Sequence, residues 1–405
     1  MKEHESIQFC KKCVLPSTLP DVIINDSTGL CTECMQKEEK DDEIVSQFYR
    51  KHMNALFERI KNENASKYDA LLLFSGGKDS VALINILKKK YKLNILALSV
   101  ITPFMTKEAL ENLEEVSSHC EIELEKYYID KNLFRDVMSY AVKNGKKYGM
   151  YENAACRLCY FMINCAGMRI AMERNIPVFI WGGDKGQYSV SYLSGNTVKS
   201  NFDKGKMPYG ILHEVFEDAV GDRYGKTLYH FDKEALKEKQ FPTQISPLTF
   251  LKVEYEDIQR EIQEMGLDFE KYKKTNTTCK AIHLFDYYAY KNYGVTSSIR
   301  EWAKGLRNNY PELKQLELGK NRKVENLSRE TILEILNEYK EVLSYVVEHE
   351  LRGEINETDR GAIDRLTPVT RQEYSQQSYD RLLENILTLN DYANYLQLNV
   401  KENQK

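Results

Sequence analysis

The feature that most constrains the fold is an apolar run that leads into a glycine corner. Residues 71–74 are Leu-Leu-Leu-Phe, which is typical of a buried strand, and residues 81–87 have the apolar spacing of a helix. Glycine allows backbone conformations that other residues rarely adopt. The sequence therefore predicts a strand, a tight turn and a helix in direct succession. The turn is a polar hexapeptide made of Ser75, Gly76, Gly77, Lys78, Asp79 and Ser80.

Such a turn is suited to anion binding. Backbone N–H groups and the positive end of the following helix point at one spot, where a phosphate chain can bind. Lys78 adds a positive charge, and the hydroxyls of Ser75 and Ser80 can bond phosphate oxygens or a metal-bound water. The hexapeptide is not a Walker A motif, because its spacing differs and Lys78 is followed by Asp79. The alternative is a tight strand-to-helix turn that binds no ligand.

The hexapeptide resembles the signature of the PP-loop ATP pyrophosphatases, which are adenine nucleotide alpha hydrolase-like proteins with a HUP-like parallel sheet. The resemblance implies that residues 75–80 bind ATP and Mg²⁺, with Lys78 and Asp79 in catalytic roles. It also implies that the β- and γ-phosphates leave as pyrophosphate. A substrate oxygen then attacks the α-phosphate and becomes an adenylate.

The pattern beyond the corner alternates strands with helices. Strands separated by helices of this length predict right-handed crossovers and an α/β fold with a parallel sheet covered on both faces. Ligands then bind at the carboxyl ends of the strands. The predicted strands are residues 94–100, 121–129 and 178–181, and the predicted helices are residues 107–119, 133–144 and 160–174.

A second glycine loop follows the predicted strand 178–181. It is similar to the second glycine loop of PP-loop enzymes, where the turn faces the nucleotide. The resemblance implies that Gly182 and Gly183 shape the turn, that Asp184 reaches a magnesium ion and that Lys185 reaches a phosphate. The alternative is an ordinary surface turn, which uses the same residue types.

Composition and charge indicate a globular protein of two or three domains. The chain has 405 residues, of which 42% are hydrophobic and 29% charged, with a formal net charge of -4. This charge offers no general attraction to polyanions, although a local basic patch could still bind RNA. No apolar run is long enough to cross a bilayer, and the first residues are too polar for a signal peptide. We therefore expect a cytoplasmic protein without a membrane partner.

Four of the nine cysteines have the spacing of a zinc site. Two Cys-x2-Cys pairs, Cys10 with Cys13 and Cys31 with Cys34, are separated by seventeen residues. Each pair presents two thiolates to one metal ion, so the spacing predicts a structural zinc ribbon that Zn²⁺ stabilises. The alternative is four free thiols.

The residues between these cysteines are similar to the N-terminal motif of N-acetyl sugar amidotransferases, which are PP-loop enzymes. The likeness covers residues 1–90 well and residues 90–300 more loosely. It implies a nucleotide-sugar or other small-molecule substrate whose acetamido oxygen is adenylated and replaced by ammonia. It also implies a separate glutaminase partner that supplies the nitrogen.

Three further cysteines indicate a different chemistry. Cys156 and Cys159 open a predicted helix, where the helix N-terminus lowers a thiol pKa, and Cys279 lies far downstream. Three thiolates that leave one iron open resemble the [4Fe-4S] site of PP-loop tRNA-thiolating enzymes, which implies a sulfurtransferase with tRNA and a sulfur donor as partners. The alternatives are a zinc site or redox pair, or simple packing of small apolar side chains.

The remaining segments complete the predicted organisation. Residues 188–241 show no sustained period and predict a long irregular lid or substrate loop, with a disordered flap as the alternative. Beyond residue 286 the pattern is mostly helical, with apolar stripes over 331–347 and 379–398 that suggest a docking or homodimer role. A non-catalytic nucleotide-binding protein is the third functional class. The predicted domains are a zinc-ribbon-like module (1–40), a linker helix (41–66), a PP-loop domain (67–265) and a helical domain (266–405).

Overall fold

The structure, a computed structural model, describes most of the first three quarters of the chain. The chain divides into two compact units. The sheet unit comprises Glu39–Met138 and Arg157–Thr278, and the cysteine unit comprises Met1–Glu38, Ser139–Cys156 and Cys279–Lys405. The predicted four-domain division stays a prediction. The described residues are 7–35, 42–63, 66–183, 191–204, 210–251, 253–273, 279, 285, 289, 292, 293, 295 and 297–308.

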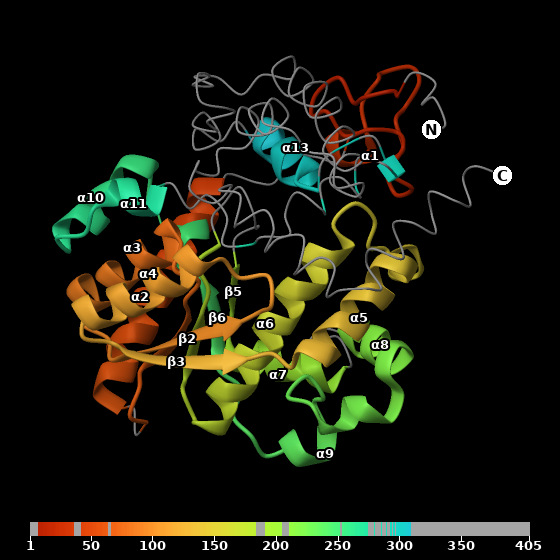
Figure 1. Cartoon of the computed structure of the whole chain (residues 1–405). Coiled ribbons are helices and arrows are strands. Elements are labelled where there is room, and N and C mark those ends of the chain that lie inside the picture. The colour runs from red at the N-terminus through yellow and green to blue at the C-terminus, as the bar shows by residue number, and fades with distance from the viewer. Residues whose placement is uncertain are drawn as a thin grey trace, which may run out of the picture. The chain divides into compact units, whose positions relative to one another are not determined.

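The sheet unit is built on a six-stranded sheet, with β2, β3, β5 and β6 labelled in Figure 1. The strand order is β3-β2-β1-β4-β6-β5. Strands β1 to β4 and β6 run parallel, which confirms the predicted α/β fold. The edge strand β5 pairs antiparallel with β6, and no alternating pattern had predicted it. The strands are β1 (Ala70–Leu73), β2 (Ile95–Ile101), β3 (Glu123–Tyr128), β4 (Val178–Ile180), β5 (Ser191–Leu193) and β6 (Thr243–Ser246).

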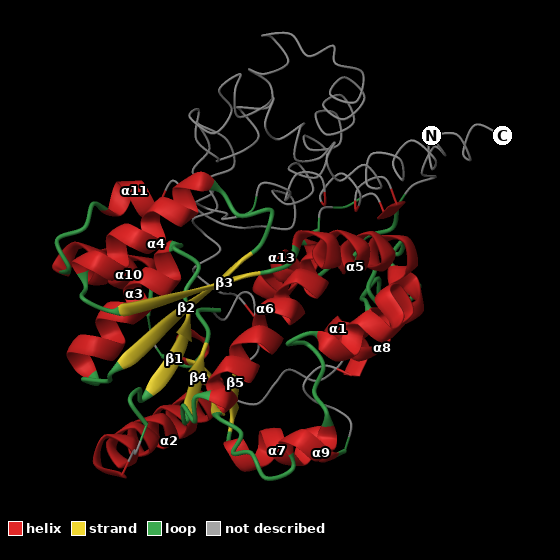
Figure 2. Cartoon of the chain, turned by 60° about the horizontal axis from the view of Figure 1, so that its bottom comes forward, coloured by secondary structure: helices red, strands yellow, loops and turns green. Residues whose placement is uncertain are grey.

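One face of this sheet packs against five helices. Alternate strand residues such as Ala70 and Leu72 point into a shared core with these helices, because successive side chains of a strand face opposite ways. Figure 2 shows α3, α4, α10 and α11 on this side of the sheet. The five helices are α2 (Asp42–Glu63), α3 (Lys78–Asn85), α4 (Lys107–His119), α10 (Tyr255–Glu264) and α11 (Phe269–Lys273).

Helix α6 (Ala154–Glu173) packs against the other face of the sheet. A β-carbon at Gly167 would lie 2.6 Å from the Phe179 ring and 2.9 Å from the Leu73 side chain. This close approach requires glycine at that position of the helix. Both faces of the sheet are therefore covered, as the buried apolar runs predict.

Helix α2 lies within the predicted linker-helix range 41–66, and it is buried in its second half, as at Met53 and Phe57, whereas Ile44 and Phe48 in its first half are exposed. Residues 188–241 were expected to be irregular, and this prediction is wrong. The described part of that segment contains β5, α7 (Gly195–Asp203), α8 (Gly210–Val220), the 3₁₀ turn η3 (Gly221–Lys226) and α9 (Lys233–Leu236).

The helices within residues 188–241 are short and capped, which explains why the sequence there shows no sustained apolar period. The Ser194 side chain accepts a hydrogen bond from the Thr197 N–H and caps α7, and Asp232 accepts one from the Ala235 N–H and caps α9. Each helix buries only a few side chains, such as Phe202 and Leu236. A helix of this length gives too few repeats for its period to be recognised in a sequence.

The cysteine unit has a small core shared by chain segments far apart in the sequence. Leu15 and Leu19 of the N-terminal loops pack with Ile299 and Ala303 of α13 (Ile299–Asn308). The Thr18 hydroxyl also donates a 2.5 Å hydrogen bond to the Tyr293 carbonyl. The predicted stripes at 331–347 and 379–398 lie outside the described residues.

The remaining described elements of the chain are α1 (Thr32–Met35), the π-helical turn η1 (Ile86–Lys90), α5 (Lys131–Asn144), η2 (Gly145–Tyr148) and η4 (Pro247–Thr249).

Candidate functional site

The glycine corner (residues 75–80) lies at the carboxyl end of β1, near the middle of the sheet. β1 pairs with β2 on one side and with β4 on the other, so the strand order changes direction here. Open parallel sheets bind ligands at such a switch point, outside the carboxyl ends of the strands. The corner therefore occupies the position that the fold favours for a ligand.

Helix α4 fixes the conformation of the corner. Gly76 has a φ of +76°, and a β-carbon there would lie 2.7 Å from the Ala109 carbonyl oxygen. The fully buried Asn112 donates a 3.2 Å hydrogen bond from Nδ2 to the Gly76 carbonyl. Glycine is required at position 76 both for its backbone angle and for this close approach.

The side chains of the corner hold the start of α3. The Ser80 hydroxyl donates to the Gly77 carbonyl at 2.9 Å, and Ser75 Oγ lies 3.4 Å from both the Gly77 nitrogen and Ser80 Oγ. Gly77 is the N-cap residue and provides no side-chain cap for the first N–H groups of α3. Those N–H groups are oriented to bind an anion at the N-terminus of the helix.

Lys78 and Asp79, the first two residues of α3, form an ion pair. Lys78 Nζ lies 2.6 Å from Asp79 Oδ1, and both side chains are about a quarter exposed. A phosphate would compete with Asp79 for the lysine, because both are anionic acceptors. The released carboxylate would then be suited to a magnesium ion, which prefers carboxylate and phosphate oxygens.

The structure brings the second glycine loop to the same place. A β-carbon at Gly182 would lie 3.5 Å from the Ser80 backbone nitrogen, so the loop lies beside the start of α3. The buried Ser246 hydroxyl lies 2.5 Å from the Gly183 carbonyl and 3.2 Å from the Trp181 carbonyl. Asp184 and Lys185 lie outside the described residues, and their predicted contacts stay predictions.

Sequence patterns had not identified Asn112 and Ser246 as site residues. Each is a buried polar side chain whose hydrogen bonds hold a loop of the site. Buried polar groups need partners, but those partners become known only once α4 and β6 are packed beside the corner. Nothing in the local sequence distinguishes either residue, because other polar residues such as Glu111 and Gln244 lie close to them.

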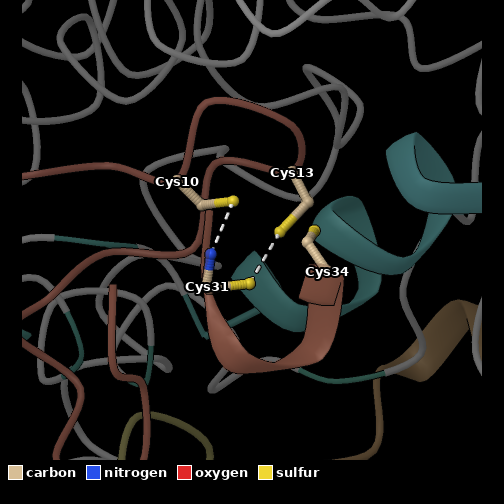
Figure 3. Close-up of side chains that lie close together, drawn as sticks. All are labelled: Cys10, Cys13, Cys31 and Cys34. Atoms are coloured by element: carbon tan, nitrogen blue, oxygen red, sulfur yellow. Dashed lines mark hydrogen bonds between the residues drawn. The ribbon is translucent and has the colours of Figure 1, made fainter. Parts of the chain in front are cut away.

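The four cysteines of the predicted zinc ribbon converge in the cysteine unit. Their sulfur atoms all lie within 4.8 Å of one another, and the side chains point into one common space (Figure 3). Cys13 Sγ and Cys31 Sγ are 3.6 Å apart. With zinc–sulfur bonds of about 2.3 Å, sulfurs in a tetrahedral site are separated by about 3.8 Å. The four thiols therefore fit a tetrahedral zinc site.

Hydrogen bonds and burial affect these thiols differently. Burial raises the pKa of Cys10, but N–H groups of Cys31, Cys13 and Lys12 outweigh it, and the pKa falls to about 7. The Cys31 N–H lies 3.2 Å from Cys10 Sγ. Burial raises the pKa of Cys13 to about 12. A divalent cation would favour the thiolate form of every ligand, since metal binding releases the thiol protons.

The three cysteines of the predicted iron–sulfur site are all half-buried. Cys156 and Cys159 lie in the first two turns of α6, as their spacing predicts, although α6 begins six residues before the predicted start at residue 160. Cys279 is also half-buried. The prediction that the three bind one [4Fe-4S] cluster stays a prediction. The remaining cysteines agree with a packing role, since Cys165 is fully buried and Cys120 partly buried.

None of the described helices is both long enough and apolar enough to span a bilayer.

Comparison with known sequences identifies one relative and no family. No family model matches the chain. The relative is the uncharacterized protein MJ1599 of Methanocaldococcus jannaschii, which is 30% identical over 173 residues. The match covers 43% of this chain and 58% of MJ1599, so the chain spans just over half of that relative's length.

Comparison with solved structures identifies many similar chains, among them three that are each 16% identical to this chain. NMN synthetase from Francisella tularensis has a TM-score of 0.32, covering 70% of this chain and 100% of that one. The U34-tRNA thiolase NcsA from Methanococcus maripaludis, with its [4Fe-4S] cluster, has a TM-score of 0.30 and coverages of 80% and 98%. NH3-dependent NAD synthetase from Campylobacter jejuni subsp. jejuni NCTC 11168 has a TM-score of 0.31 and coverages of 79% and 99%. These TM-scores are low, so the fold rests here on the chain's own sheet order and register.

Proposed function

We propose that the protein is an ATP-dependent transferase of the PP-loop type, which forms AMP and pyrophosphate. The observation that supports this most is the glycine corner itself. It follows the central strand at the switch point, opens into the start of α3, and has Gly182 of the second loop beside Ser80. A turn that binds nothing would not need both loops to meet at a helix N-terminus.

In this proposal the corner binds the β- and γ-phosphates of ATP. The N–H groups at the start of α3 and the Lys78 ammonium stabilise the negative charge that develops on pyrophosphate as it leaves. Asp79, released from Lys78, would hold Mg²⁺, whose charge would offset further negative charge on the phosphates. A substrate oxygen attacks the α-phosphate and pyrophosphate leaves. The product is an adenylate, in which that oxygen now belongs to an AMP leaving group. A nucleophile then displaces AMP.

The acceptor that we favour is an N-acetylated sugar, with nitrogen as the transferred atom. The residues between the four zinc-site cysteines support this choice through their similarity to N-acetyl sugar amidotransferases. Adenylation of the acetamido oxygen followed by attack of ammonia would give an acetamidino group. A glutaminase partner would supply the ammonia.

Thiolation of tRNA or of a small molecule is the second candidate. It is supported by Cys156 and Cys159, which lie three residues apart at the start of α6, where the helix dipole favours thiolates. With Cys279 they would hold a [4Fe-4S] cluster that takes sulfur from a donor. Anaerobic purification followed by iron and sulfide analysis separates the two candidates. Nitrogen transfer predicts a colourless protein without sulfide, whereas a brown protein containing iron and sulfide favours thiolation.

The role of the corner is tested by calorimetric binding of Mg²⁺-ATP and of inorganic pyrophosphate. We expect Lys78→Ala to weaken both by about 10-fold or more, because a hydrogen bond to a charged group contributes about 1.5–3 kcal/mol. The matched control is Lys107→Ala, which removes an exposed lysine paired with Glu111 on α4. Unchanged binding of both ligands by Lys78→Ala would contradict the proposed site.

A further inference from the structure

One arginine of α13 contacts the predicted metal site directly. Arg307 Nη1 lies 3.5 Å from Cys13 Sγ, and its Nη2 lies 2.7 Å from a carboxylate oxygen of Glu33. Glu33 lies between Cys31 and Cys34 in the sequence. A single guanidinium therefore bonds one sulfur of the site and the loop that carries two others.

A second arginine of α13 ties the same loops to a buried carboxylate. Arg300 donates to Glu152 at 2.8 Å and to Asp21 at 2.7 Å, and it lies 3.4 Å from Glu33. The Glu152 side chain is fully buried, and Arg300 is the cation that compensates its charge. Glu33, which directly precedes Cys34 in the sequence, thus contacts both arginines.

The charge of the site explains why an arginine is needed there. Four thiolates and one Zn²⁺ carry a net charge of −2, and three of the four cysteines are fully buried. Buried charge is costly unless it is paired and hydrogen-bonded. The Arg307 guanidinium meets both requirements, because it is cationic and donates an N–H toward sulfur.

We propose that Arg307 is a functional part of the metal site. Metal binding then stabilises the packing of α13 on the cysteine loops (residues 10–13 and 31–34), and this packing in turn strengthens metal binding. Metal binding favours the thiolate form of the four cysteines, and this negative charge attracts Arg307. Arg307 lies on the same helix as Ile299 and Ala303, which pack in the core of the cysteine unit. The same guanidinium also pairs with Glu33, so one cation of α13 joins a metal-site sulfur and the segment between Cys31 and Cys34. The proposal is independent of the ATP site.

The direct test replaces Arg307 in the full chain. We expect Arg307→Gln to weaken Zn²⁺ binding by about 10–100-fold in chelator competition, which is the usual effect of removing a hydrogen-bond partner of a metal ligand. With Co²⁺ in the site, loss of the N–H···S bond should also shift the sulfur-to-cobalt charge-transfer band. Arg307→Lys, which keeps the charge, should restore part of the affinity. The control is Arg260→Gln, which removes an exposed arginine from the ion pair with Asp257 on α10.

The second test leaves the sequence unchanged. Removal of the metal by a chelator should raise amide hydrogen exchange at least 10-fold in residues 299–308, and it should leave exchange in α10 unchanged. Because this measurement uses the unchanged chain, it tests the coupling between the metal and α13 even if Arg307→Gln folds poorly. The proposal is overturned by wild-type affinity and cobalt spectrum in Arg307→Gln, or by unchanged exchange in α13 after verified metal loss.

Discussion

At the residue scale, the corner depends on one left-handed backbone position. Gly76 and Gly266 have nearly the same φ, +76° and +77°, so alanine at either incurs the strain of a left-handed conformation, about 1–2 kcal/mol. Only at Gly76 would the new β-carbon meet a backbone atom, the Ala109 carbonyl oxygen at 2.7 Å. At Gly266 the nearest atom is a His119 ring atom at 3.8 Å. The two glycines therefore separate backbone strain from close contact.

We predict that Gly76→Ala lowers the free energy of unfolding by about 1–3 kcal/mol more than Gly266→Ala, because overpacking adds to the backbone strain. Urea unfolding measures this difference. Gly76→Ala should also weaken ATP binding, since α4 and the start of α3 are pushed apart, while Gly266→Ala should not. Equal stability losses and unchanged ATP binding would contradict the close packing of α4 on the corner.

Residues with special local chemistry were the ones that the sequence could predict. Gly76 and Gly77 were recognised because their position after an apolar strand leaves few conformations, and Cys10 and Cys13 because their spacing is short. Asn112 was not recognised. Its function depends on a hydrogen bond to Gly76, which is 36 residues away and is brought near only by packing of the sheet and α4. Local patterns carry no information on such partners.

At the element scale, α10 has a reciprocal cap that links stability to pH. The Glu254 side chain accepts from the Asp257 N–H, and the Asp257 side chain accepts a 2.9 Å hydrogen bond from the Glu254 N–H. The hydrogen bond from Glu254 and the nearby Arg260 lower the pKa of Asp257 below its ordinary value of 3.8. The ionised carboxylate is therefore favoured in the folded state.

We predict that Asp257→Ala lowers the free energy of unfolding by about 0.5–1 kcal/mol at pH 7. A lowered folded-state pKa means that the stabilisation is complete above pH 3.8 and is lost as the pH falls through the folded-state value. The difference between wild type and Asp257→Ala should thus narrow below pH 3.8. Asp257→Asn, which keeps an acceptor without the charge, should fall between the two at pH 7. A difference that grows on acidification would contradict this role.

Elements with long apolar patterns were predicted well. Helix α4 spans the predicted residues 107–119, and β2 and β4 lie within one residue of their predicted ends. Helix α6 begins at Ala154, six residues before the predicted range 160–174, although Cys156 and Cys159 lie in its first turns as predicted. The short elements between residues 188 and 241 were missed because caps such as Ser194 and Asp232 set their limits, and these leave only a local signal.

At the scale of the whole molecule, the sequence predicted two sites but not how one of them is supported. The spacing of the four cysteines predicts a common metal, and the structure gathers their sulfur atoms. Nothing in that spacing indicates that residues 299–308 pack on the cysteine loops. Contact between segments more than 250 residues apart is set by shared burial and by ion pairs such as Arg300 with Asp21. Such pairing cannot be predicted from periodicity.

The most direct test of the central claim is the position at which ATP is cleaved. The purified protein would be supplied with Mg²⁺, ammonia and ATP labelled in the α- and γ-phosphates, with an N-acetylated nucleotide sugar as acceptor, and the products separated. In a parallel assay tRNA and a sulfur donor replace the sugar and ammonia. A corner that holds the β- and γ-phosphates predicts labelled AMP and labelled pyrophosphate in equal amounts, both lost in Lys78→Ala. Formation of ADP and free phosphate would contradict the account.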